Sequence, residues 1–71
     1  MTTLQDLREQ ALLSRAELAR LCGVSHQAIY YWEHGESAPR IDHIRKLVEA
    51  LHKTPEEIRA AIKASQKDWA A

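Results

Sequence analysis

The chain has 71 residues, of which 45% are hydrophobic, and its ten Lys and Arg residues balance ten Asp and Glu residues. This length fits one domain spanning residues 1–71, with a modest core. No apolar run reaches the length of a membrane span, and the N-terminus lacks the layout of a signal peptide, so we expect no membrane association. The single cysteine excludes an internal disulfide and favours a reducing, cytoplasmic setting.

The first two predicted helices cover about residues 3–12 and 14–22. Leu4, Leu7 and Ala11 follow helical spacing in the first. Ser14 begins the second, and a glutamate three residues later completes the pattern of a capping box. Gly23 ends the second helix, because glycine adopts the left-handed conformation without steric strain. The apolar side of this helix is predicted to hold Leu18, Leu21 and Cys22.

A third helix is predicted over about 25–34, so close behind the second that it must cross it sharply, as in a helix-turn-helix. One of its faces is apolar, formed by Ala28, Ile29 and Trp32. The opposite face is a row formed by Gln27, Tyr30, Tyr31 and His34. Each side chain of that row has a hydrogen-bonding group on a short or rigid stem. Solvent exposure alone would be served as well by Glu and Lys, which favour helix more strongly. The row therefore predicts a recognition surface.

Two further helices follow a loop between Gly35 and Pro39. One is predicted over about 41–51, with an apolar side of Ile41, Ile44, Leu47, Val48 and Leu51. The other is predicted over about 55–68, begins with a capping threonine at position 54, and carries Ile58, Ala61, Ile62, Ser65 and Trp69 on one side. No segment alternates with a period of two, so the predicted fold is all-α with five helices.

The ordered pattern of these residues resembles the Cro/repressor type of helix-turn-helix domain, also called the XRE family, to which the phage lambda and 434 repressors belong. The resemblance covers about residues 4–58 and rests on Leu18-Ala19, Gly23-Val24-Ser25, Ile29, Trp32-Glu33, Gly35, Pro39 and Ala50-Leu51. It implies a five-helix, lambda-repressor-like domain that binds double-stranded operator DNA. It also implies a homodimer, with the third helix of each copy in the major groove.

The family's functional positions map onto this sequence residue by residue. Base contacts are implied for His26, Gln27, Tyr30 and Tyr31. Contacts to the DNA backbone are implied for Arg15, Ser25, His34 and Arg40. A structural ion pair between the first and third helices is implied for Arg8 and Glu33. His52 stands where relatives commonly have glycine, so a left-handed turn there would be strained.

Simpler structural roles stand beside these functional ones. Tyr30 or Tyr31 could pack at the edge of the core or be ordinary surface, and Trp32 is expected in the core rather than as a stacking platform. The four histidines lack the spacing of metal ligands, so we expect no metal site and no cofactor. Cys22 is expected to be an inert buried thiol. We expect a dimer contact from Ile58, Ile62 and Trp69, the alternative being that the tryptophan folds back onto the first and fifth helices.

Together these patterns predict a transcriptional regulator without catalytic activity, specifically a phage or bacterial repressor that binds an inverted-repeat operator as a dimer. A protein co-regulator stays open as a further partner. The alternative is a helix-turn-helix protein-interaction module, such as an adaptor or antitoxin. The zero net charge favours this alternative, because DNA-binding proteins usually carry a basic excess.

Overall fold

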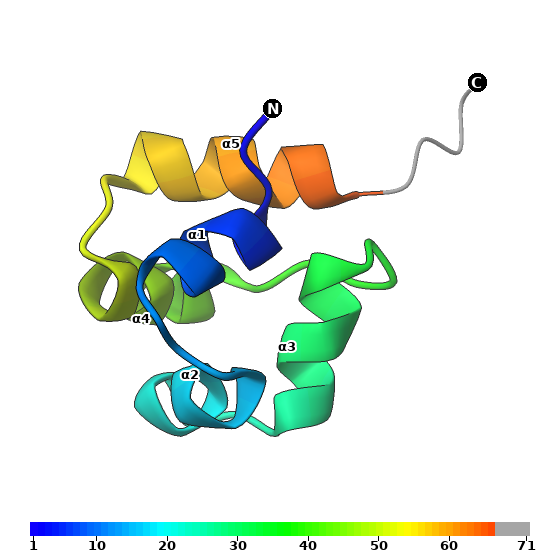
Figure 1. Ribbon diagram of the computed structural model, residues 1–71. Coiled ribbons are helices and arrows are strands. Elements are labelled where there is room, and N and C mark those ends of the chain that lie inside the picture. The colour runs from blue at the N-terminus through cyan, green and yellow to red at the C-terminus, as the bar shows by residue number, and fades with distance from the viewer. Residues whose placement is uncertain (67–71) are drawn as a thin grey trace.

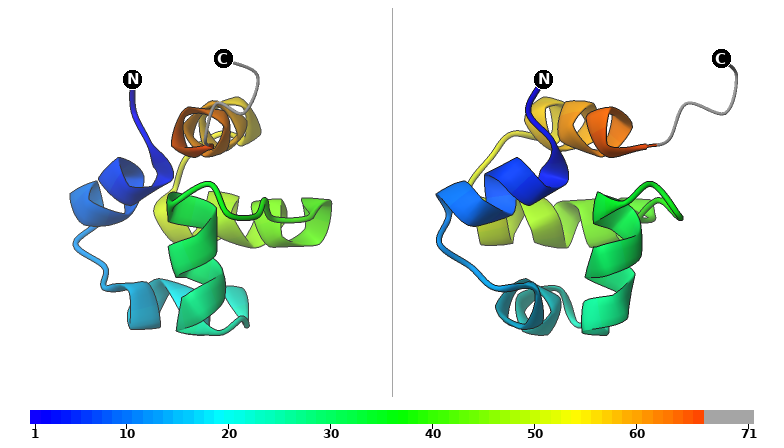
Figure 2. Two further views of the ribbon diagram at one scale, coloured as in Figure 1. Left: turned by 90° about the vertical axis from the view of Figure 1, so that its right-hand side faces the viewer. Right: turned by 45° about the vertical axis from the view of Figure 1, so that its right-hand side comes forward.

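The computed structural model describes residues 1–66, and these form five helices without any strand: α1 (Leu4–Gln10), α2 (Arg15–Cys22), α3 (His26–Glu33), α4 (Ile41–Leu51) and α5 (Pro55–Ser65). The predicted all-α, five-helix fold is confirmed. Figure 1 shows α5 across one end of the domain and α2 at the other, with α3 running between these two ends; the views in Figure 2 agree. α2 packs against α3 and α4, while α5 packs against α1 and α4.

Short polar side chains fix where four of the helices begin. The side chains of Thr3, Ser14, Ser25 and Thr54 each accept a hydrogen bond from a backbone N–H in the first turn. Reciprocal capping boxes form at α1, α2 and α5, in the pairs Thr3 with Asp6, Ser14 with Glu17, and Thr54 with Glu57. Each box satisfies backbone donors that a helix start would otherwise leave unpaired. The box at α2 and the capping threonine of α5 were predicted, whereas the box at α1 was not.

Two helices end earlier than predicted. α1 stops at Gln10 because Leu12 has a left-handed backbone with φ of 59°, and the amide of Leu13 then donates to the carbonyl of Arg8 at 3.2 Å. The sequence holds no glycine at this turn to signal it. α5 stops at Ser65 because the next residue, Gln66, has an extended backbone.

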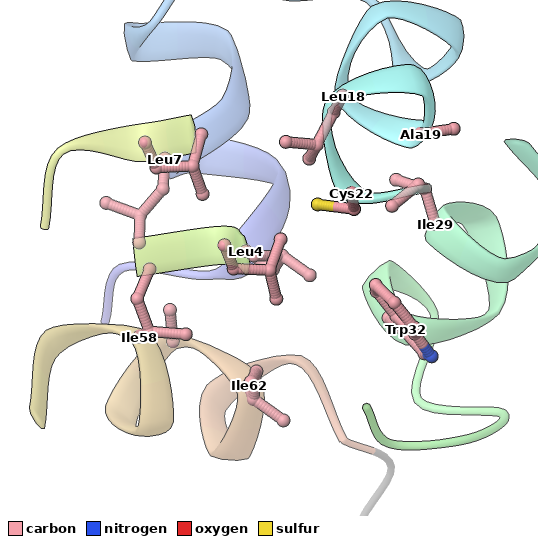
Figure 3. Close-up of a cluster of buried hydrophobic side chains, with 12 residues drawn as sticks. Leu4, Leu7, Leu18, Ala19, Cys22, Ile29, Trp32, Ile58 and Ile62 are labelled. Carbon is pink, nitrogen blue, oxygen red and sulfur yellow. The ribbon is translucent and has the colours of Figure 1, made fainter. Parts of the chain in front are cut away.

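The core lies where all five helices meet, and its fully buried side chains are Leu4, Leu18, Ile29, Leu47 and Ile58. Trp32 is 5% exposed and points into the same cluster, so its predicted place in the core is confirmed (Figure 3). The prediction that Leu21 and Ile41 belong to buried helix faces is wrong, because Leu21 is 54% exposed and Ile41 is 63% exposed. Both lie at a helix end: Leu21 is one residue before the last of α2, and Ile41 is the first residue of α4.

The predicted dimer contact through Ile58 and Ile62 is also wrong. Both side chains are buried in the domain's own core, because α5 turns its apolar side onto α1 and α4. Figure 3 draws both on α5 as members of the cluster of buried hydrophobic side chains. The third residue of that prediction, Trp69, lies outside the described residues.

Candidate nucleic-acid interface

The connection between α2 and α3 fixes how α3 is presented. Gly23 has a left-handed backbone with φ of 72°, and the amide of Val24 donates to the carbonyl of Ala19 at 3.0 Å. Ser25 then caps α3, because its hydroxyl accepts from the amide of Ala28 at 3.2 Å. Three residues therefore separate the two helices, and α3 turns away sharply from α2 (Figure 1). This is the geometry of a helix-turn-helix.

α3 has one buried face and one exposed face, as its sequence predicted. Ile29 is fully buried, and Trp32 lies beside it in the core. The exposed residues of this helix include His26 and Gln27, together with Tyr30 at 42% and Tyr31 at 45%. The structure thus places the four residues implied for base contacts on the surface of one short helix. Their side chains are polar at the tip and carry no formal charge with histidine neutral.

The ring of Tyr30 is held by three neighbours. The Arg15 guanidinium carbon lies 5.3 Å from the ring centroid, and the His34 imidazole stacks on the ring at 3.9 Å between centroids. Tyr31 meets Tyr30 edge-on at 6.0 Å. His34 Nδ1 is 2.9 Å from the Tyr30 carbonyl oxygen, which can only accept, so this nitrogen carries the proton and donates. Tyr30 is therefore a surface side chain with a fixed orientation.

Glu33 joins three helices at the base of this surface. Its side chain is fully buried and accepts hydrogen bonds from Arg8 of α1, through Nε and Nη2. It also accepts from Nε of Arg15 at 2.9 Å, which ties in the start of α2. Arg8 extends the network by donating to the carbonyl of Leu13 at 2.9 Å. The ion pair that the family resemblance implied for Arg8 and Glu33 is present, with a second arginine added to it.

The bond from Arg15 to Glu33 was missed in the sequence, although a signal was available. Glu33 follows Ile29 by one helical turn, which puts it toward the apolar side of α3. It is also the last residue of the helix, where the helix dipole disfavours an anion. An acid in that place needs buried cationic partners. Arg8 of α1 and Arg15 at the start of α2 supply them.

The remaining residues implied for DNA backbone contacts differ in how they are placed. Arg40 is exposed and precedes α4 without any side-chain hydrogen bond to that helix start. Ser25 is exposed but already uses its hydroxyl as the cap of α3. His34 is half-buried and is occupied with Tyr30. Of these three residues, Arg40 is the one whose side chain is not occupied by a helix cap or by the contact with Tyr30.

Other chemistry is sparse around this surface. Cys22 is 4% exposed, and burial raises the pKa of its thiol, which keeps it protonated and unreactive. Within residues 1–66, no three His, Cys, Asp or Glu side chains gather as metal ligands would. No helix in this part of the chain combines the length and apolar character that crossing a membrane requires.

Comparison with known proteins identifies the architecture. A family model described as Helix-turn-helix matches residues 4–58, which include the Gly23 turn and the whole of α3. Searches of curated proteins and of solved structures gave no match. Because the family match covers more than half of the chain, the protein belongs to the helix-turn-helix family of the Cro/repressor (XRE) type, a family of DNA-binding regulators.

Proposed function

We propose that this protein is a sequence-specific regulator of transcription that binds double-stranded DNA with α3 in the major groove. The observation that carries the proposal is the surface of α3, which exposes Gln27, Tyr30 and Tyr31 while burying Ile29 and Trp32. The amide of a glutamine can pair with an adenine edge through two hydrogen bonds. Tyrosine hydroxyls can bond to bases or phosphates, and their rings can contact thymine methyl groups.

The phosphate contacts in this proposal come from Arg15, Arg40 and the backbone amides at the start of α2. Helix N-termini favour anions, and arginines bind phosphates through charge-assisted hydrogen bonds. The chain as a whole is neutral, so we expect few such contacts. Burial of Glu33 between two arginines supports the proposal, because it removes one negative charge from the surface that faces DNA.

We further propose that two copies bind an inverted repeat and act as a repressor. The α3 helices would then enter successive major grooves about 34 Å apart, as in other helix-turn-helix dimers. A repressor bound there would compete with the polymerase for the promoter. This role needs no catalytic residue and no cofactor.

Selection of bound sequences from random duplex DNA tests the proposal, followed by measurement of the stoichiometry on the selected site. We expect a palindromic sequence bound by two chains. Gln27→Ala should then relax the preference at one base pair and weaken binding to the selected site by ~1–3 kcal/mol. Gln10→Ala, an exposed glutamine on α1, is the matched control and should leave the selected sequence unchanged. Equal weakening of Gln27→Ala on every sequence would contradict a base contact.

A protein-interaction module is the second candidate function. The zero net charge and the half-exposed pair Tyr30 and Tyr31 favour it, since tyrosines also anchor protein interfaces. Salt dependence separates the two candidates. DNA affinity should fall steeply between low and moderate salt, whereas a contact centred on tyrosines should change little.

A further inference from the structure

The side chain of Arg15 is held at two points before any ligand arrives. Its Nε donates to Glu33 Oε1 at 2.9 Å, and its guanidinium carbon lies 5.3 Å from the centre of the Tyr30 ring. Only one of the five N–H groups of the guanidinium is used in this bond, and 35% of the side chain remains exposed. Arg15 is thus fixed in orientation while most of its donors are left for another partner.

Glu33 does not need Arg15 to be neutralised. Arg8 already gives it two hydrogen bonds and is itself buried, so this pair alone would satisfy the carboxylate. Adding Arg15 leaves the three side chains with one excess positive charge. That charge belongs to the most exposed member, Arg15, beside the ring of Tyr30.

We propose that Glu33 is a positioning residue for DNA binding, which holds Arg15 so that its outer N–H groups bind a phosphate next to the base contact of Tyr30. This inference rests on the proposed function. A long arginine side chain loses much conformational freedom when it binds, and fixing it beforehand reduces that loss. The contact of Arg15 with Tyr30 also sets the distance between the phosphate contact and the base contact.

The variant Arg15→Lys tests positioning separately from charge. Lysine keeps the positive charge, but it has only one nitrogen in its charged group. It therefore cannot bond to Glu33 through one nitrogen and to a phosphate through the others, as the guanidinium of Arg15 can. We expect it to bind the selected DNA about tenfold more weakly, with an unchanged slope of affinity against salt, because the number of neutralised phosphates is the same. Arg20→Lys, an exposed arginine of α2, is the matched control and should bind within about twofold of wild type.

The outcomes of this comparison are distinct. Binding by Arg15→Lys as tight as that of Arg20→Lys would overturn the positioning role and leave the proposed function standing. Failure of the wild-type chain to bind any duplex would overturn both. Weaker binding with a reduced salt slope would also overturn the inference, because it would mean that the lysine no longer reaches the phosphate at all.

Glu33→Gln provides a second line of evidence. A glutamine has one acceptor oxygen, so Arg8 and Arg15 would compete for it, and the variant Arg15→Lys/Glu33→Gln should bind no more weakly than Glu33→Gln alone. Because Glu33→Gln leaves Arg8 buried with a neutral partner, it can fail to fold. In that case, the nuclear magnetic resonance signal of the Arg15 Nε–H in the DNA-free wild type tests whether Glu33 holds Arg15 before DNA binds. We expect this proton to exchange with water at least tenfold more slowly than that of Arg20, and equal exchange would overturn the inference.

Discussion

Two residues other than glycine have left-handed backbones in the described part of the chain, and replacing each by glycine should stabilise the fold. Leu12 has φ of 59° in the turn after α1, and His52 has φ of 54° at the end of α4. An L-residue in this conformation has its Cβ too close to the following carbonyl oxygen. Glycine has no Cβ and adopts the same backbone without this strain.

The size of the effect follows from two opposing contributions. Removing the left-handed strain gains about 1–2 kcal/mol at each site. Glycine loses about 0.4–1 kcal/mol of this, because it makes the unfolded chain more flexible. Leu12 is 88% exposed and His52 is also exposed, so little packing is lost with either side chain. We therefore expect Leu12→Gly and His52→Gly each to raise the free energy of unfolding by about 0.5–1 kcal/mol.

Thermal and urea unfolding followed by circular dichroism measure this effect. For a domain of this size, each substitution should raise Tm by roughly 2–8 °C, and the two should add because they lie in separate turns. Gly23→Ala is the converse control. Its φ is 72°, and beyond the glycine and its two chain neighbours no heavy atom lies within 4 Å of the added Cβ, so it should lower stability through backbone strain alone. If Gly23→Ala destabilised the domain while Leu12→Gly and His52→Gly left Tm unchanged or lower, the reasoning would be refuted.

Three further predictions concern the caps and the core. Hydrogen bonds from Ser14, chiefly from its backbone N–H, lower the pKa of Glu17 in the fold. The stabilisation by the charged carboxylate is therefore present above the unfolded value of 4.5 and is lost as pH falls through the lower folded value, so Glu17→Gln, which removes the titrating carboxylate, should weaken the acid dependence of urea unfolding below pH 4.5. The thiol of Cys22 should react with an aromatic disulfide reagent at the rate of global unfolding, and rapid reaction in the native protein would contradict its burial. Ile29→Ala should lower the free energy of unfolding by about 2–5 kcal/mol, whereas Leu21→Ala should change it by less than about 1 kcal/mol; equal losses in urea titrations would contradict their different burial.

The sequence was most informative where the physics is local. A capping residue, its acidic partner three positions later and the apolar spacing within one helix all lie within a few residues, and they predicted the starts of α2 and α5 and the two faces of α3. It was least informative at turns without glycine. The left-handed backbone of Leu12 depends on the path that the chain takes after this residue. A leucine side chain does not indicate such a conformation.

Burial at helix ends also depended on distant parts of the chain. The periodicity of α4 includes Ile41 as well as Leu47, yet only Leu47 is covered, because coverage depends on which neighbouring helix extends that far. The same reasoning applies to α5. Its apolar side predicted a surface for a partner, but α1 and α4 cover it within the domain.

The sequence by itself determined the five-helix fold, the sharp turn at Gly23 and the row of hydrogen-bonding side chains on α3, because each follows from spacing along one or two adjacent helices. Only the tertiary structure decided that Glu33 is shared between Arg8 and Arg15, and that Arg15 lies against Tyr30. These contacts join residues that are 15 to 25 positions apart. Nothing in local spacing fixes their distances, which are set by how α1 and α2 pack around α3.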